Sequence, residues 1–363
     1  MKTTRQWLIC LMLLFPLCTM AEEVVVNKIR YNADLESQTA EVIHTPEYLS
    51  GSVTIPETIE VNGVSCRVTS IGVNALNTNV GVTEFILPNT VTKIGKAAFE
   101  GCWMTSITLP SNLETIGDMA FMDCHIRSIT LPESLQEIGE EAFCQSYLES
   151  AVIHSVHIRQ NAFMDCDSLT TVVIADGVKS IGKEAFYRCS ALKSVVLGDD
   201  VWYIGDKAFA MCKSLEELKM GKSVMQIGKD AFSTCESLKT LSLPESVKNI
   251  SDYAFAGCSS LADVYCYTTS VPPYASGFAF SPSVSSATLH VVEALIDQYK
   301  AIKPWSMFGS IVALSDADSI MGINAVSSAA ANMDGEWYSL DGRRVAQPAK
   351  GIYVKNGRKV AIK

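Results

Sequence analysis

The residues best placed to do chemistry in this chain are cysteines, because seven of them recur at regular intervals. Each lies three residues after a repeated phenylalanine, in the set Cys102, Cys124, Cys166, Cys189, Cys212, Cys235 and Cys258. Such a column could form disulfides or metal sites, or it could consist of small buried apolar side chains. Their number is odd, equivalent side chains in stacked repeats point in parallel, and Ser146 occupies one slot. Since Cys-x-x-Cys is also absent, the pattern favours buried side chains without metal or cofactor.

The other motifs that could support catalysis or metal binding are weak. Asp199-Asp200 and Glu216-Glu217 are candidate carboxylate pairs, but neighbouring residues on a strand face opposite sides. Gly221-Lys222-Ser223 lacks the earlier glycine of a phosphate-binding loop. His154 and His157 could supply part of a metal site, but no further histidine lies nearby in the sequence. We therefore expect no enzymatic activity.

The elements that would position these residues form a repeat array. An Ala-Phe pair recurs every 20 to 23 residues, with its ring at Phe99, Phe121, Phe143, Phe163, Phe186, Phe209, Phe232 and Phe255. Each repeat also carries a Leu-x-x-Leu-x-Leu pattern, which predicts a parallel strand with its last two apolar side chains pointing inward. The period predicts a mainly β solenoid, a right-handed leucine-rich repeat array of about nine repeats. A glycine that follows isoleucine in most repeats indicates a positive φ or a close backbone approach.

Composition and pattern divide the chain into segments. We expect a signal peptide (1–21), an N-terminal β-hairpin cap (22–51), the solenoid (52–266), a C-terminal cap (267–314), a linker (315–332) and a small β module (333–363). The hairpin is expected to turn at Asn32-Ala33-Asp34. The C-terminal cap is expected to contain a helix at Glu293–Lys300 and to cover the open end with Trp305, Phe308 and Ile311.

Two local features complete this division. The repeat at 148–168 is shorter than those that follow and has Ile158-Arg159 where Ile-Gly is expected, which predicts a tightened turn. In the last segment, Asp341-Gly342 and Asn356-Gly357 predict hairpin turns.

The N-terminal residues indicate where the protein is located, and the net charge limits the classes of partner. Lys2 and Arg5 precede an apolar run at 7–17, and Thr19-Met20-Ala21 offers a cleavage site, which predicts an exported protein, extracellular or on the outer cell surface. No other apolar run reaches about 18 residues, so we expect no transmembrane segment. The formal charge of −10 becomes −12 without residues 1–21, with 27 basic and 39 acidic residues, and argues against nucleic-acid binding.

The repeat Ile-Gly-x-x-Ala-Phe-x-x-Cys-x-x-Leu-x-x-Val-x-Leu-Pro, over about 52–266, resembles the BspA-like leucine-rich repeat family. This family is found on the surfaces of Bacteroidetes and some other microbes. The resemblance implies a surface protein that adheres to host or matrix proteins. Residues 338–344 and 350–354 are similar to the end of a type IX secretion sorting domain, which implies secretion by that route and surface attachment.

The outward positions of the predicted strands supply the candidate interaction face. We expect a concave face carrying Ser106, Ser128, Ser150, Thr171, Val173, Ser194, Val196, Glu217, Lys219 and Thr240. Hydroxyl and aliphatic side chains in rows could bind an extended protein or glycan, although such residues also simply suit strands. The expected function is non-catalytic binding of a host or matrix protein. The alternatives are a structural spacer of the cell surface and a glycan-capturing module, against which the scarcity of aromatic residues in these rows counts.

Overall fold

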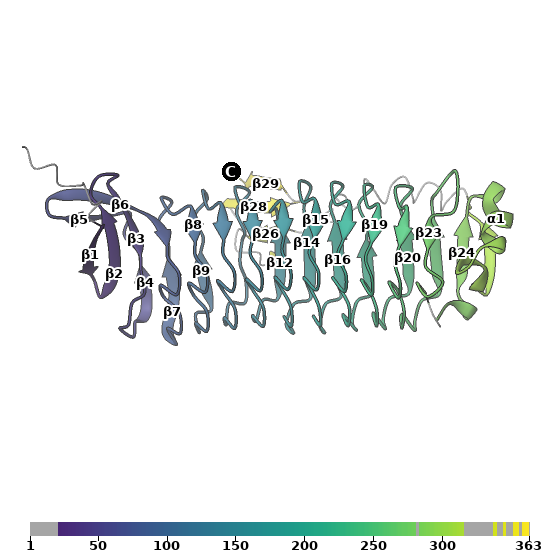
Figure 1. The fold of residues 1–363 in the computed structure, drawn as a ribbon, viewed down its shortest axis with the longest axis horizontal. Coiled ribbons are helices and arrows are strands. Elements are labelled where there is room, and N and C mark those ends of the chain that lie inside the picture. The colour runs from purple at the N-terminus through teal and green to yellow at the C-terminus, as the bar shows by residue number, and fades with distance from the viewer. Residues whose placement is uncertain are drawn as a thin grey trace, which may run out of the picture.

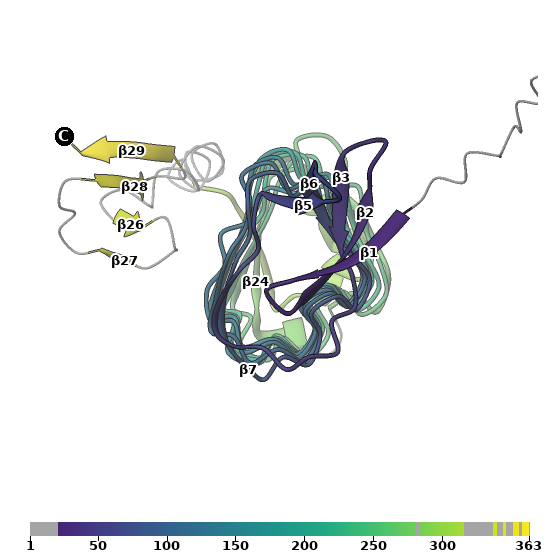
Figure 2. The same ribbon diagram turned by 90° about the vertical axis from the view of Figure 1, so that its left-hand side faces the viewer.

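The computed structural model describes residues 21–280 and 283–315, together with the backbone of short strands between 337 and 362. Over the first two ranges the chain winds into a β-solenoid of about ten turns, so the predicted fold class is confirmed. Figures 1 and 2 show the turns stacked along a nearly straight axis. Residues 1–20 of the expected signal peptide, residues 316–332 of the expected linker and the turns at 341–342 and 356–357 lie outside the described residues.

Most of the Leu-x-x-Leu-x-Leu segments form strands on one side of the solenoid, whereas the segment around Ser128 contributes a single bridge. They lie in three parallel sheets: β4 (Ser50–Thr54), β7 (Gly81–Ile86) and β9 (Ser106–Thr108); β12 (Ser150–Ile153), β14 (Thr171–Ile174), β16 (Ser194–Leu197) and β18 (Glu217–Lys219); and β20 (Thr240–Leu243), β22 (Asp263–Cys266), β24 (Thr288–Val291) and β25 (Ser310–Ala313). Their apolar side chains alternate inward, as shown by the buried Val172 and Ile174 of β14. This confirms the predicted direction of these side chains.

A second, longer sheet forms another side of the solenoid, and the sequence pattern did not predict it. Its strands end at the isoleucine before the repeated glycine or at the equivalent position. Parallel pairing joins the eight-residue β6 (Val64–Ile71) to a series of two-residue strands, β8 (Lys93–Ile94), β10 (Thr115–Ile116), β11 (Glu137–Ile138), β13 (His157–Ile158), β15 (Ser180–Ile181), β17 (Tyr203–Ile204), β19 (Gln226–Ile227), β21 (Asn249–Ile250) and β23 (Tyr274–Ala275). Two residues are too few for a period-2 pattern, so only the pairing between turns reveals these strands.

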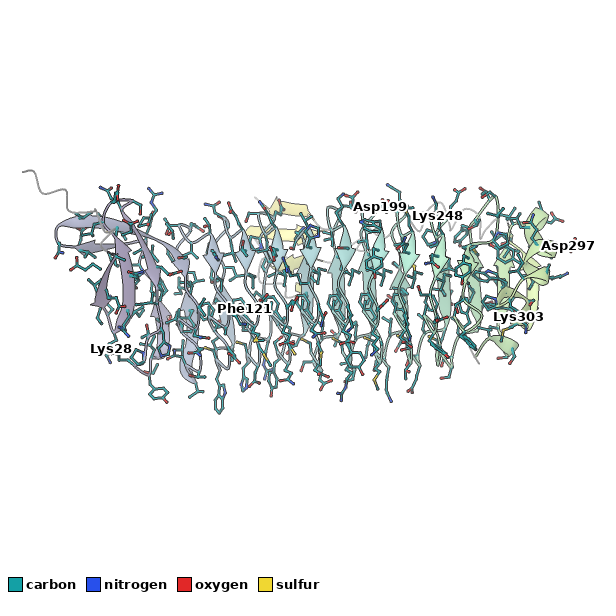
Figure 3. All side chains as sticks on the ribbon, viewed as in Figure 1. Lys28, Phe121, Asp199, Lys248, Asp297 and Lys303 are labelled. Atoms are coloured by element: carbon teal, nitrogen blue, oxygen red, sulfur yellow. The ribbon has the colours of Figure 1, made fainter. Side chains whose placement is uncertain are left out.

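The repeated phenylalanines stack into a continuous column inside the solenoid. From Phe99 to Phe280, successive ring centroids are 5.0–5.4 Å apart and the ring planes differ by 2–10°. Figure 3 shows Phe121 within the outline of the rod. The column extends past Cys266, the predicted end of the solenoid, because Ala279-Phe280 supplies one more pair at a longer spacing. Each ring is therefore buried mainly by the turns before and after it.

The cysteine column is buried beside these rings, as predicted. Each of the seven thiols donates a hydrogen bond of 2.9–3.4 Å to a backbone carbonyl one turn earlier, at Leu76, Phe99, Phe143, Phe163, Phe186, Phe209 or Phe232. All ten cysteines among the described residues are buried and free. The side chains thus fill space and also supply donors between turns, a role that their spacing did not reveal.

The repeated glycine allows close approach of successive turns. A Cβ on Gly205 would lie 2.7 Å from the carbonyl carbon of Gly182, and one on Gly95 would lie 2.8 Å from that of Gly72. Neither glycine has a positive φ, so close packing is the correct alternative of the two predicted. In the shortened repeat, Arg159 takes this position and its exposed side chain pairs with Glu137 at 2.5 Å.

Three strands precede the repeats, β1 (Ala21–Val26), β2 (Ile29–Asp34) and β3 (Thr39–Val42), and they extend the long sheet. The predicted turn position was wrong, because Asn32 and Ala33 lie inside β2. One turn lies instead at Asn27-Lys28, where both residues have a positive φ, and the other follows Asp34. The strand β5 (Thr58–Val61) pairs with β6.

The C-terminal end of the solenoid is covered by a helical turn and aromatic side chains. The segment contains η1 (Ser283–Ser286), η2 (Glu293–Leu295), α1 (Ile296–Ala301) and η3 (Trp305–Met307), so the helix predicted at Glu293–Lys300 begins as a 3-10 turn. Trp305 is fully buried, lies 5.4 Å from the ring of Phe280 and donates its indole N–H to the Pro273 carbonyl. Tyr299 is also fully buried and donates to Cys266 Sγ at 3.1 Å.

The strands of the last segment form a separate antiparallel sheet in the order β27-β26-β28-β29. They are β26 (Trp337–Ser339), β27 (Arg344–Val345), β28 (Gly351–Lys355) and β29 (Arg358–Ile362).

Candidate functional site

The outward-facing residues of β12, β14, β16 and β18 form the surface that we call the strand face. Register pairs Ser150 with Thr171, Thr171 with Ser194, and Ser194 with Glu217, so these four residues form one row across the sheet. A second row runs through Val152, Val173, Val196 and Lys219. Neighbouring strands are about 4.7–4.9 Å apart, so each row presents its side chains at that interval.

The structure does not bring all the predicted site residues into this sheet. Ser128 joins the first row through a single bridge to Ser150, whereas Ser106 belongs to the sheet of β9 and Thr240 to that of β20. The surface was also expected to be concave. Because the turns stack along a nearly straight axis, the strand face is instead one side of a rod (Figures 1 and 2).

The side chains of the strand face are partly exposed and largely uncharged. Thr171, Val173, Ser194 and Val196 are each of intermediate burial. At one edge, the Ser194 hydroxyl donates to Glu217 Oε2 at 3.2 Å, which orients this carboxylate along the sheet. The surface offers hydroxyl donors and acceptors beside aliphatic side chains, a combination suited to binding rather than to proton transfer.

The candidate carboxylate pair at Asp199-Asp200 does not form a catalytic dyad. Asp199 pairs with Lys222 Nζ at 2.7 Å, while Asp200 accepts the Gly177 N–H at 2.9 Å and pairs with Lys179 Nζ at 3.3 Å. The hydrogen bond from Gly177, followed by the contacts from Lys179, lowers the pKa of Asp200. The two carboxylates therefore have different partners and do not share a proton. Figure 3 shows Asp199 at the edge of the rod.

The remaining motifs are also dispersed. Lys222 of the Gly-Lys-Ser sequence is engaged by Asp199. His154 directly follows β12 of the strand-face sheet, whereas His157 begins β13 of the long sheet, so the two histidines belong to different sides of the solenoid. Within the described part of the chain, no group of three or more potential metal ligands comes together.

An exposed aromatic row that sequence reasoning missed lies next to the cysteine column. The Trp103 and His125 rings stack with centroids 5.2 Å apart and planes 7° apart, and the His125 and Tyr147 centroids are 4.6 Å apart at 54°. Trp103 and Tyr147 are about half exposed, at 56% and 49%. The signal was present in the sequence, because each residue directly follows Cys102, Cys124 or Ser146. These positions lie outside the predicted strands, so the outward strand pattern does not include them.

A surface hollow of about 440 Å³ begins where this row ends. Tyr147 lines it together with Gln145, Asp165, Asp167, Ser168 and Arg188, among others. Arg188 Nε lies 3.3 Å from Asp165 Oδ1, and the Ser190 hydroxyl donates to Asp167 Oδ1 at 2.8 Å. The hollow therefore combines one aromatic wall with oriented charged groups.

A further cluster lies near the C-terminal end, on the same side of the solenoid as the strand face. His290 Nε2 lies 2.9 Å from Asp263 Oδ1, and its ring stacks on Tyr265 at 4.3 Å with planes 12° apart. No sequence motif connects these residues, since Asp263 and His290 are 27 positions apart.

Among the described residues, no helix has the length and apolar composition needed to cross a membrane. No curated protein matches the chain. Solved structures that are similar include a leucine-rich repeat protein from Bacteroides ovatus, with 24% identity, 80% of this chain and 100% of that chain covered, and a TM-score of 0.37. A leucine-rich repeat protein of T. pallidum has 27% identity, 60% and 91% coverage, and a TM-score of 0.45. A leucine-rich cell surface protein of Faecalibacterium prausnitzii has 21% identity, 84% and 97% coverage, and a TM-score of 0.31.

The family of the chain follows from its repeats. The family model of the BspA type leucine rich repeat region, which contains six copies of the repeat, matches residues 69–193 and 156–284. These ranges contain the phenylalanine column, the cysteine column and the strand face. Leucine-rich repeat solenoids of this kind are typically non-catalytic. Since the match spans more than half of the 363 residues, the protein belongs to the BspA type leucine rich repeat family.

Proposed function

We propose that this protein is exported and binds a macromolecular partner, a host or matrix protein, through the strand face without catalysing a reaction. The observation that supports this most directly is the in-register pair of rows on β12, β14, β16 and β18. A row of hydroxyls beside a row of valines offers an extended polypeptide hydrogen-bond partners for its backbone groups and apolar contacts for its side chains. The charged N-terminal segment at 2–5 followed by the apolar run at 7–17 supports export.

The face is suited to a partner because its side chains are already fixed. Each strand is hydrogen-bonded to its neighbours, and the inward residues Val172, Val195 and Leu218 are almost fully buried. Binding to such a surface therefore costs little ordering of the backbone. Partial exposure leaves Thr171 and Ser194 accessible to a partner without removing them from the sheet.

The proposal is tested by binding the purified protein to arrays of extracellular-matrix proteins and of polysaccharides. The double variant Thr171→Arg with Ser194→Arg places two bulky cations in adjacent positions of the first row. We expect capture of a matrix protein by the wild type and its loss in this variant, with little change in melting temperature because both positions are partly exposed.

The matched control places two arginines in the same part of the solenoid, but on the long sheet instead of the strand face. His157 and Ser180 pair in register on β13 and β15, so His157→Arg with Ser180→Arg adds similar bulk to the other side of the solenoid. This variant should keep its binding. Capture that survives the strand-face variant, or that is lost equally in both, would contradict the proposal.

A structural spacer is the second candidate, and one specific observation favours it. The stacked rings run without interruption from Phe99 to Phe280 along a nearly straight rod (Figure 1). Such a rod would hold other surface components at a fixed distance. The array experiment separates the two functions, because a spacer would bind nothing through the strand face.

A further inference from the structure

We propose that the hollow beside Tyr147 is a carbohydrate subsite that holds one uncharged pyranose ring. The hollow has a volume of about 440 Å³, which lies within the range of about 300–1,000 Å³ that is usual for small-molecule sites. The site is distinct from the two rows of the strand face, and it could be occupied whether or not a protein binds there.

The aromatic row explains why the site lies at Tyr147 rather than elsewhere along the row. Trp103 and His125 are stacked at 7°, so they cover the faces that they turn toward each other. Tyr147 contacts His125 of the preceding turn and lines the hollow together with Asp165, Asp167 and Arg188 of the following turns, while Asp123 of the preceding turn completes the lining. A pyranose has an apolar C–H face that packs against an aromatic ring, and Tyr147 supplies such a ring at one wall.

A change of residue type between the turn of Tyr147 and the next turn creates the space for the pyranose ring. The residue that follows the cysteine column changes from an aromatic side chain at Tyr147 to the shorter Asp167 one turn later. Asp167 therefore forms part of the floor or wall of the hollow instead of continuing the row. The aromatic row therefore ends, and the hollow begins, because Asp167 stands at the position that an aromatic residue occupies in the preceding turns.

The polar lining suits the hydroxyl groups of a sugar. Asp165 and Asp167 can accept hydrogen bonds from hydroxyls, while Gln145 and Arg188 can donate to their oxygens. Two of these groups are already oriented, because Arg188 is paired with Asp165 and Asp167 accepts the hydrogen bond from Ser190. Preoriented carboxylates lose less side-chain entropy when a ligand binds.

The charge of the hollow restricts the class of sugar. Three aspartates, Asp123, Asp165 and Asp167, line it against the single cation Arg188, which gives a formal charge of −2. A carboxylate on the ligand would meet like charge at short range. Neutral hexoses and N-acetylhexosamines should therefore bind in preference to uronic or sialic acids.

The test is calorimetric titration of the full chain with neutral hexose, N-acetylhexosamine and uronic-acid oligosaccharides. We expect saturable binding of at least one uncharged oligosaccharide and weaker binding of its uronic-acid counterpart. Tyr147→Ala should weaken the affinity about tenfold, equivalent to about 1.4 kcal/mol, whereas Tyr147→Phe should nearly preserve it because the ring face remains. Asp167→Asn should weaken binding by removing a carboxylate acceptor.

The matched control is Tyr253→Ala. Tyr253 is another partly exposed tyrosine of the solenoid, and it stacks on Phe278 instead of lining the hollow. Melting curves would show whether each variant is folded. If Tyr147→Ala does not fold, Asp167→Asn still tests the site. The inference is overturned if no uncharged saccharide saturates the wild type, if Tyr147→Ala and Asp167→Asn both bind like wild type, or if Tyr253→Ala weakens binding as much as Tyr147→Ala.

Discussion

At the scale of single residues, the buried thiols connect one turn of the solenoid to the next. Cys212 Sγ donates to the Phe186 carbonyl at 3.2 Å, and the other members of the column repeat this contact. Burial raises the pKa of Cys102 and of Cys258 to about 12, and it raises the pKa of Cys166 and Cys235 well above the usual value. The thiols are therefore held in the protonated form, which is the form that can donate.

These shifts predict that the protein loses stability in alkaline solution. Above the ordinary thiol pKa of 9.0 the unfolded chain releases protons that the folded chain retains, so the folded state binds more protons and unfolding is favoured as pH rises. The contribution is complete below about pH 9 and is lost as pH rises toward 12. Burial also raises the pKa of Tyr31 to about 12, which acts in the same direction.

Urea unfolding followed by circular dichroism between pH 7 and 11 would measure this effect. The free energy of unfolding should be nearly constant up to about pH 9 and then decrease. Alkylation of the native protein at pH 8 should leave the ten described cysteines unmodified until urea unfolds the chain. Stability that increases above pH 9, or rapid labelling of the native thiols, would contradict the burial of this column.

At the scale of the structural element, the glycine column sets the spacing between turns. A Cβ added to Gly205 would lie 2.7 Å from both the Gly182 carbonyl carbon and the Ile181 carbonyl oxygen. These are backbone atoms of the paired strand region, so a clash cannot be relieved by turning a side chain. The short strands of the long sheet depend on this close approach, because each contributes only two residues to the pairing.

Gly205→Ala should therefore destabilise the protein by about 1–3 kcal/mol, the usual cost of overpacking. The control is Gly277→Ala, because an added Cβ there meets nothing within 4 Å and Gly277 has no positive φ. The control should change stability by no more than about 0.5 kcal/mol. Equal urea midpoints for the two variants would show that the close approach at Gly205 is not what fixes the spacing.

At the scale of the whole molecule, each turn is stabilised by its neighbours, so the ends of the array need separate protection. At the C-terminal end, Trp305 lies 5.4 Å from Phe280 and is fully buried, and Phe308 also contacts Phe280 at 5.4 Å. The last ring of the column is thus covered by aromatic side chains from the following segment. In a quasi-one-dimensional array, loss of this cover destabilises the adjacent turns first.

Trp305→Ala should destabilise the protein by about 3–5 kcal/mol, through lost burial and the cavity that remains. Hydrogen exchange should show loss of protection that begins in β22, β23 and β24 and decreases toward the N-terminal turns. Met307→Ala, in the same 3-10 turn but partly exposed, should leave this pattern unchanged. A uniform loss of protection along the array would contradict a covering role for Trp305.

The sequence by itself determined the repeat with its recurring phenylalanine, the inward direction of the strand residues and the burial of the cysteine column. These features were predictable because a fixed period places equivalent residues of adjacent turns next to each other, whatever the details of each turn. The sequence also contained the rows of the strand face, since period-2 alternation fixes which side chains point outward.

Only the tertiary structure decided how those turns are joined and what their surfaces offer. The long sheet, the thiol donors to backbone carbonyls and the division of the strand residues among three sheets all depend on hydrogen bonds between adjacent turns, such as those of Cys166 and Cys212 to carbonyls 23 and 26 positions earlier. The side-chain directions outside the strands, which produce the hollow between Tyr147 and Arg188, follow no short sequence period. Local pattern specifies which residues are inside, whereas the contacts of adjacent turns determine which surface groups meet.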